Sequence, residues 1–135
     1  MGRRELRENI FKLLFVRAFK QAEEMPEQMD MYFENNVENL KEADQTYMEN
    51  KYQNISEHIE ELDTIINDAS TGWKTTRMGK VDLTILRLAV YEMKFDEDVP
   101  VGVAINEAVE LAKKFGQDES ASFINGILGT ISKGI

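Results

Sequence analysis

The chain of 135 residues contains no cysteine, and this absence excludes several classes of protein. Without cysteine there is no disulfide framework, no thiolate metal site and no cysteine nucleophile, as is typical of a protein in a reducing compartment. The two prolines, Pro26 and Pro100, and the lack of any Gly/Ser-rich run argue against a flexible linker. No apolar segment is long enough for a signal peptide or a membrane span. We therefore expect a cytoplasmic protein that does not associate with membranes.

Side chains suited to catalysis are also scarce. His58 is the single histidine and lies in an acidic stretch, where it is most simply a surface residue. Glu107 and Glu110 share a helical face, but the Glu-x-x-His pairs of di-metal bundles are missing. Lys80 follows a glycine without the glycine spacing of a phosphate-binding loop, and Ser120 has no base nearby in the sequence. We expect a protein that is not an enzyme and uses no cofactor or metal.

The charge is strongly segregated along the chain, although its net value is −9. Residues 1–20 carry six Lys and Arg against two acidic residues, whereas residues 21–70 carry two against fourteen. Residues 71–135 are nearly balanced, with eight basic and nine acidic residues. Because screening at physiological salt acts over about 8 Å, a basic end can present its own local field beside an acidic middle. The alternative is an ordinary solvated helix end.

Within the basic end, Arg3, Arg4 and Arg7 cluster at the start of a predicted helix. Arg3 and Arg7 are four residues apart and so lie on one side, which Phe11 and Phe15 extend by further steps of four. A helix start adds backbone donors and a partial positive charge. Arginines beside aromatic rings are typical of contact with single-stranded RNA, where guanidinium groups bind phosphate and rings stack on bases. Both phenylalanines could equally belong to the core.

Apolar residues recur at helical spacing through almost the whole chain, and strand-like alternation is rare. We expect all-α structure of about seven helices in two small packed bundles, an N-terminal half at 1–70 and a C-terminal half at 71–135 that form one compact unit. Two stripes of apolar residues along the helix at 81–95 predict that this helix is central and buried. Trp73 and Val103 are also expected in the core. The predicted helices cover residues 3–21, 26–50, 55–69, a short segment at 73–78, 81–95, 101–115 and a last helix from about 120.

Glycines and polar residues mark the ends of the last two helices. Gly116 is placed to close its helix in a left-handed cap, and Asp118 or Ser120 is placed to cap the next helix. Gly126 is unusual inside a helix, where it costs about 1 kcal/mol relative to alanine. Close packing of a neighbouring helix and close approach of RNA backbone would each explain it.

Three sequence blocks in the second half are specific in their order and spacing. Residues 73–92 read WKTTRMGKVDLTILRLAVYE, residues 104–116 read AINEAVELAKKFG and residues 120–128 read SASFINGIL. With the basic start at Arg3, Arg4 and Arg7, the chain resembles the NusB family of bacterial transcription antitermination factors over essentially its full length. Residues 22–70 match only in helical character.

The resemblance implies a fold of two packed helical bundles and a function without catalysis. It implies binding of single-stranded boxA RNA, including that of ribosomal RNA leaders, together with NusE, a protein of the small ribosomal subunit. The complex then helps RNA polymerase to read through terminators. Two other functions stay open, a protein-binding helical adaptor without RNA contact and a helical module that assists an RNA-modifying enzyme.

Site residues follow from the resemblance position by position. Glu5 interrupts the arginine cluster where some relatives carry another basic residue, so RNA affinity without the partner is expected to be weaker. Asn106 and Glu107 open a helix and are expected to cap it or to pair with Arg87. The resemblance assigns RNA contact to Arg3, Arg4, Arg7, Phe15, Ser120 and Phe123, with Asp118 and Glu119 on a loop nearby, and the surface for the protein partner to Asp82, Leu83 and Arg87.

Overall fold

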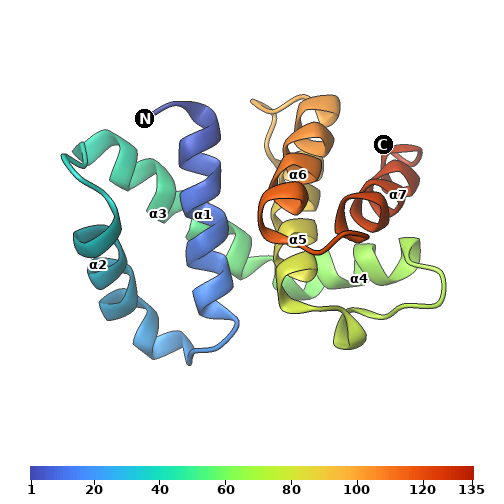
Figure 1. The fold of residues 1–135 in the computed structure, drawn as a ribbon, viewed down its shortest axis with the longest axis horizontal. Helices are drawn as coiled ribbons and strands as arrows, with labels where there is room; N and C mark the ends of the chain where they lie inside the picture. The colour runs from blue at the N-terminus through green and yellow to red at the C-terminus, as the bar shows by residue number, and fades with distance from the viewer. The chain divides into compact units, whose positions relative to one another are not determined.

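The computed structural model describes residues 1–135 and contains helices but no strands, which confirms the all-α prediction (Figure 1). The helices predicted at 81–95 and 101–115 match the structure almost residue for residue, whereas the first half of the chain differs more. The α-helices are α1 (Arg3–Arg17), α2 (Met25–Asn36), α3 (Glu42–Glu57), α4 (Ile59–Ala69), α5 (Lys80–Phe95), α6 (Val101–Phe115) and α7 (Ser120–Ser132), with 3-10 turns η1 (Ala22–Glu24) and η2 (Thr75–Arg77).

The chain divides into two compact units, Met1–Ser56 and Glu57–Ile135. The sequence division placed the boundary after residue 70 instead. The difference concerns α4, which contacts α5 and α7 and therefore belongs to the second unit. Its apolar face, with Leu62 and Ile66 completely buried, has the helical periodicity expected from the sequence.

In the first unit, α1 buries a wide apolar surface. Ile10 and Leu13 are fully buried, and Phe11 and Leu14 nearly so, which agrees with the helical spacing of apolar residues in this part of the sequence. Further core residues come from the other two helices of this unit. They are Met25, Met29 and Phe33 of α2 and Met48, Tyr52 and Ile55 of α3.

The prediction of one helix from residue 26 to 50 is wrong, because α2 and α3 are separate helices. The chain leaves α2 at Val37, which is extended, and passes through Asn39, whose φ of 52° is left-handed. Asparagine tolerates this conformation better than most residues because its short polar side chain can bond locally. Val37 and Leu40 keep the apolar spacing across the break, so the periodicity alone concealed it.

In the second unit, α5 is the central helix and contacts α4, α6 and α7. Ile85, Leu86 and Val90 are fully buried, and Leu88 and Ala89 are almost so. This burial confirms the prediction from the two apolar stripes. Pro100 stands directly before α6, where its missing N–H is not needed and its carbonyl accepts a hydrogen bond from Ala104.

Two residues expected inside are exposed. Trp73 is 53% exposed because it lies in the turn before η2 rather than within a helix. Val103 is 45% exposed because the buried face of α6 runs through Ala104, Ala108 and Leu111 instead. Among the described helices, none is both long and apolar enough to cross a membrane.

Candidate nucleic-acid interface

The start of α1 presents two of its three predicted arginines to solvent. Arg3 and Arg4 are exposed in the first turn, and Gly2 at the N-cap supplies no side chain that would satisfy the helix donors. Exposed guanidinium groups beside the backbone donors of a helix start suit an anionic ligand. Arg7, the third arginine of the cluster predicted to bind phosphate, is buried instead, with only 7% of its surface accessible. Arg7 lies on the buried side of α1, three residues before the fully buried Ile10.

The aromatic residues of α1 form a row whose members differ in exposure. Phe11 is 3% exposed and belongs to the core. Phe15 is half-buried, and its ring centre lies 6.2 Å from that of Phe11 in a stacked arrangement. Phe19 lies beyond the end of α1, is 58% exposed and meets Phe15 edge to face at 5.1 Å. Of the two phenylalanines considered for RNA, Phe15 is therefore the accessible one.

Polar side chains fix the middle of α1 against α2. Tyr32 donates a hydrogen bond to Asn9 Oδ1, and Asn9 Nδ2 donates to the carbonyl of Glu5 at 2.9 Å. Burial, together with the nearby charge of Glu8, raises the pKa of Tyr32 to about 12. Tyr32 therefore remains a neutral donor at physiological pH. This network holds the helix that carries the arginines in one position.

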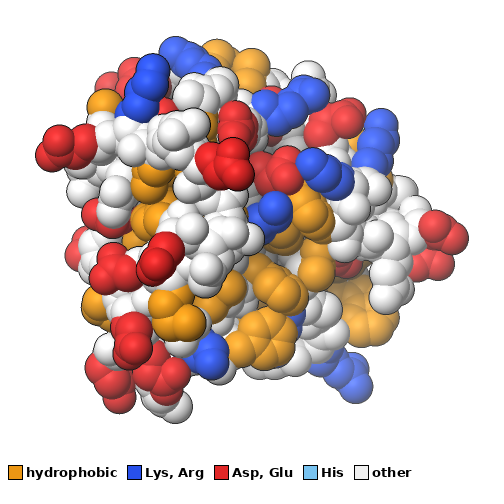
Figure 2. Space-filling view, turned by 60° about the vertical axis from the view of Figure 1, so that its left-hand side comes forward, with side chains coloured by type: hydrophobic (Ala, Val, Ile, Leu, Met, Phe, Trp, Pro, Cys, Tyr) orange, Lys and Arg blue, Asp and Glu red, His pale blue; other side chains and the backbone are white.

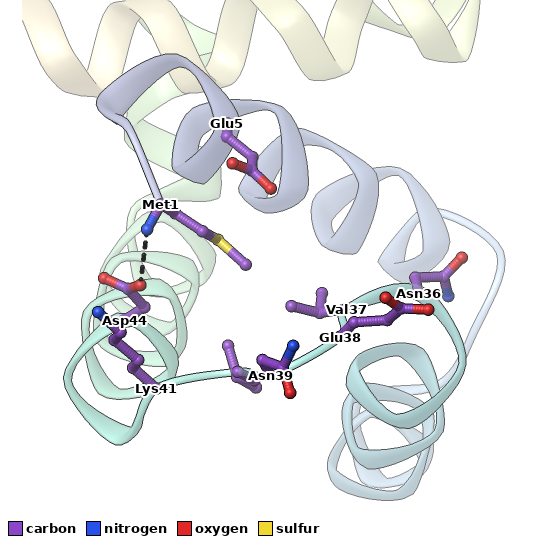
Figure 3. Close-up of a pocket in the computed structure, with 9 residues that line it drawn as sticks. Met1, Glu5, Asn36, Val37, Glu38, Asn39, Lys41 and Asp44 are labelled. Carbon is purple, nitrogen blue, oxygen red and sulfur yellow. Dashed lines mark hydrogen bonds and ion pairs between the residues drawn. The ribbon is translucent and has the colours of Figure 1, made fainter.

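A hollow of about 260 Å³ lies beside the start of α1 in the first unit (Figure 3). Glu5, Glu38 and Asp44 line it, with Lys41 as the one basic side chain of the lining. The Met1 amine donates to Asp44 at 3.1 Å, as the dashed line in Figure 3 marks. Carboxylates repel phosphate, so this hollow does not suit a nucleic acid. The exposed arginines are the better candidate in this unit.

The second unit brings Ser120 and Phe123 to one hollow of about 550 Å³. Three aromatic and two basic residues of its lining are suited to a nucleotide, and Asp82 and Glu119 also belong to it. The hollow is bordered by the turn around η2, the start of α5 and the α6–α7 connection. Its lining comprises Trp73, Arg77, Met78, Gly79, Lys80, Val81, Asp82, Phe115, Gly116, Gln117, Glu119, Ser120 and Phe123.

The α6–α7 connection is tight because residue 116 has no side chain. A Cβ at Gly116 would lie 2.6 Å from both Cβ and Oγ of Ser120. The φ and ψ of Gly116 are −91° and −170°, so the predicted left-handed cap is wrong and close approach is the reason for glycine here. The Ser120 hydroxyl accepts a hydrogen bond from the Gln117 N–H at 2.9 Å.

Ser120 therefore serves the loop rather than the helix cap. Glu119 occupies the N-cap position of α7 without a side-chain cap bond, so the prediction that Asp118 or Ser120 caps the helix is wrong. Ser120 is only 5% exposed, whereas Phe123 is half-buried one turn later. Phe123 is consequently the more accessible of the two predicted contacts.

The three residues assigned to a protein partner lie on α5 and are all half-buried. Arg87 donates two hydrogen bonds of 2.8 Å to the carboxylate of Asp63, which ties α5 to α4. Asp82 lines the hollow, and Leu83 follows it in the first turn of α5. The sequence offered Asn106 and Glu107 as partners for Arg87, and no local pattern pointed to Asp63, which is 24 residues away.

Gly126 has open space where its side chain would be. No atom lies within 4 Å of a Cβ built there, and the residue is exposed. Of the two explanations considered for this glycine, close packing by a helix of this chain is therefore wrong.

On the face drawn in Figure 2, Lys and Arg side chains are interspersed with acidic ones, so basic character is confined to local clusters there.

Comparisons with known proteins agree with these features. The model of the NusB family matches residues 4–133. A transcription antitermination protein NusB of Lachnoclostridium phytofermentans is 51% identical over 97% of this chain and 98% of its own length.

Two solved structures are similar in fold. T. maritima NusB is 33% identical with a TM-score of 0.86, covering 98% of this chain and 92% of its own. A structure of the antitermination factors NusB and NusE in complex with dsRNA is 27% identical with a TM-score of 0.81, covering 98% of this chain and 97% of its own. The match over nearly the whole chain places this protein in the NusB family of transcription antitermination proteins.

Proposed function

We propose that this protein binds single-stranded boxA RNA together with NusE and thereby helps RNA polymerase to read through terminators. The observation that carries the proposal is the pair of exposed arginines, Arg3 and Arg4, on the same helix as the accessible ring of Phe15. Residues 4 and 15 are about 16 Å apart along the helix, a span of a few nucleotides. A family member has been solved with NusE and dsRNA, which supports NusE and RNA as partners, whereas the choice of a single strand rests on the arginines and the ring.

The proposed roles follow from chemistry and exposure. Arg3 and Arg4 contact phosphates, while Phe15 and Phe123 stack on bases. Arg7 and Ser120 are both buried, so each acts from within its own unit, Arg7 in α1 and Ser120 by holding the α6–α7 connection in place. Asp82 and Leu83 contact the protein partner, and Arg87 supports that surface through Asp63. The role involves no catalysis and belongs in the cytoplasm, where nascent RNA emerges.

The test is a titration of labelled boxA RNA by fluorescence anisotropy, with and without NusE. The double variant R3E/R4E should weaken RNA binding by roughly 10- to 100-fold at physiological salt. It should also reduce the slope of log K against log salt by about 0.7 for each phosphate that the variant no longer binds. Its matched control is K94E/K133E, which changes the net charge equally at exposed positions outside α1 and outside the hollow.

The outcomes separate the proposal from its alternatives. Equal losses in R3E/R4E and in the control would mean that only overall charge matters. Unchanged RNA binding in R3E/R4E with intact NusE binding would favour the helical adaptor without RNA contact. Circular dichroism of each variant should match the wild type, because exposed substitutions change stability by less than about 0.5 kcal/mol.

A further inference from the structure

Trp73 is the single tryptophan of the chain, and its position is unusual for so large an apolar side chain. It is 53% exposed and lines the 550 Å³ hollow of the second unit. An exposed aromatic that borders a concave surface is typical of a ligand site rather than of a core residue. The roles proposed above make no use of it.

The backbone on both sides of Trp73 is fixed by buried polar groups. The hydroxyl of Ser70, which is 6% exposed, donates to the carbonyl of Trp73. Two residues later the buried Thr75 N–H donates to Asn67 Oδ1 at 2.7 Å. Gly72 has a φ of 87°, a conformation that glycine adopts without strain, and so turns the chain toward this position. These hydrogen bonds and the turn at Gly72 hold the backbone at Trp73 in place without any contact made by its ring.

The opposite side of the hollow is equally well defined. Phe115 and Phe123 flank the tight connection in which Gly116 approaches Ser120. The volume lies within the range of about 300–1,000 Å³ typical of small-molecule sites, so one nucleoside fits. Three aromatic rings around such a volume offer flat apolar surface to a ring system.

The charges around the hollow distinguish a base from a phosphate. Arg77 and Lys80 are exposed in the lining, and Lys74 is exposed beside Trp73. Asp82 and Glu119 also line the hollow and would repel a phosphate inside it. The favourable arrangement therefore places the base within the hollow and its phosphate beside Arg77.

We infer that the hollow binds one unpaired base of the RNA, which stacks on Trp73 while Arg77 contacts the adjoining phosphate. This inference rests on the proposed RNA-binding function and adds a specific nucleotide site to it. Stacking on aromatic side chains accepts every base and needs a strand that is free to leave its neighbours. The site therefore requires a base that is not paired, as in single-stranded RNA.

The test uses the fluorescence of Trp73, the single tryptophan of this chain, and the emission of W73L in the same mixture is subtracted as background. A single-stranded boxA oligonucleotide is added to the full chain with saturating NusE. The emission of Trp73 should be quenched, and the quenching should saturate at the same RNA concentration as the anisotropy of a labelled copy. Iodide should quench the remaining emission less than it does in the free protein.

Two variants measure what the ring contributes. W73L keeps an apolar side chain but removes the ring, and should weaken RNA binding about 5- to 100-fold. W73F keeps a ring and should retain most of the affinity. R77Q should weaken binding less than W73L and reduce the salt dependence. As a control, Y47A removes an aromatic residue that is 45% exposed in the first unit and should leave RNA affinity unchanged.

The possible failures are distinguishable. If RNA binds normally but Trp73 emission and W73L affinity do not change, the base site is wrong and the proposed function stands. If the wild type with NusE binds no RNA, the proposed function fails and the base site fails with it. If NusE alone changes the emission and RNA adds nothing, the hollow binds a protein side chain, which overturns the inference.

Discussion

The two surfaces proposed for RNA are built in different ways. The start of α1 exposes Arg3 and Arg4 through nothing more than their positions in the first helical turn. The hollow of the second unit is lined largely by two connections, one before η2 and one between α6 and α7, whose shapes are held by side-chain hydrogen bonds. The first surface should therefore tolerate most substitutions that keep its charge. The second should be sensitive to small changes at residues that never touch a ligand.

Arg7 gives the sharpest test on the α1 side, because it lies one turn from Arg3 and differs from it in burial. Arg7 is 7% exposed, so Arg7→Glu places a reversed charge where water is largely excluded and should destabilise the fold by about 3–5 kcal/mol. Arg4→Glu, at an exposed position, should change stability by less than about 0.5 kcal/mol. Urea unfolding of both variants measures the difference.

Equal stability of the two variants would contradict this distinction and return Arg7 to the exposed cluster. A large difference would mean that any loss of RNA binding in Arg7→Glu is an effect on folding. Arg7→Gln, which keeps most of the side chain and removes the charge, then separates packing from charge.

Gly116 is the corresponding test of the hollow. Gly116→Ala places a methyl group 2.6 Å from the Cβ of Ser120 and 2.8 Å from the carbonyl oxygen of Ala112. Relief of this overlap moves the α6–α7 connection, at a cost of about 2 kcal/mol. RNA affinity should fall as well, because Phe123 lies one turn into the displaced helix. Thermal unfolding and RNA anisotropy together measure both effects.

The sequence predicted the α1 surface better than the hollow for a physical reason. Helical periodicity is local, so Arg3, Arg4 and Phe15 could be placed on one helix from their spacing alone. Arg7 shows the limit of this reasoning, because residues four apart share a side of the helix while their burial depends on what packs there. The same limit concealed the break at Asn39, where apolar spacing continues although the helix does not.

The hollow depends on contacts between residues far apart in sequence. Trp73 and Phe123 are separated by 50 positions, and no periodic signal connects them. Tryptophan is on average highly buried, so the residue type predicted the wrong environment for Trp73. The bonds of Asn67 to Thr75 and of Asp63 to Arg87 are likewise matters of tertiary structure. The family motif located the residues, but not which of them are accessible.

Gly126→Ala adds a methyl group to a glycine of α7, as Gly116→Ala does at the α6–α7 connection, but its expected effect on stability has the opposite sign. Nothing lies within 4 Å of a Cβ at this position, so Gly126→Ala should stabilise α7 by about 0.5–1 kcal/mol. If RNA backbone approaches this glycine, the variant should be more stable and yet bind RNA more weakly. Urea unfolding gives the first quantity and anisotropy the second. Increased stability with unchanged RNA affinity would remove RNA as the explanation for the glycine.

Glu5 gives the smallest effect and the most direct test of how the α1 surface works. It is exposed in the first turn beside Arg4 and lines the acidic hollow of Figure 3 rather than pointing into the core. Glu5→Lys should therefore leave stability within about 0.5 kcal/mol and increase RNA affinity a few-fold. If the new cation meets a phosphate, the salt slope should steepen by about 0.7, whereas a general field effect would leave it nearly unchanged. Glu5→Gln, which removes the negative charge without adding a cation, should raise affinity less and keep the wild-type slope.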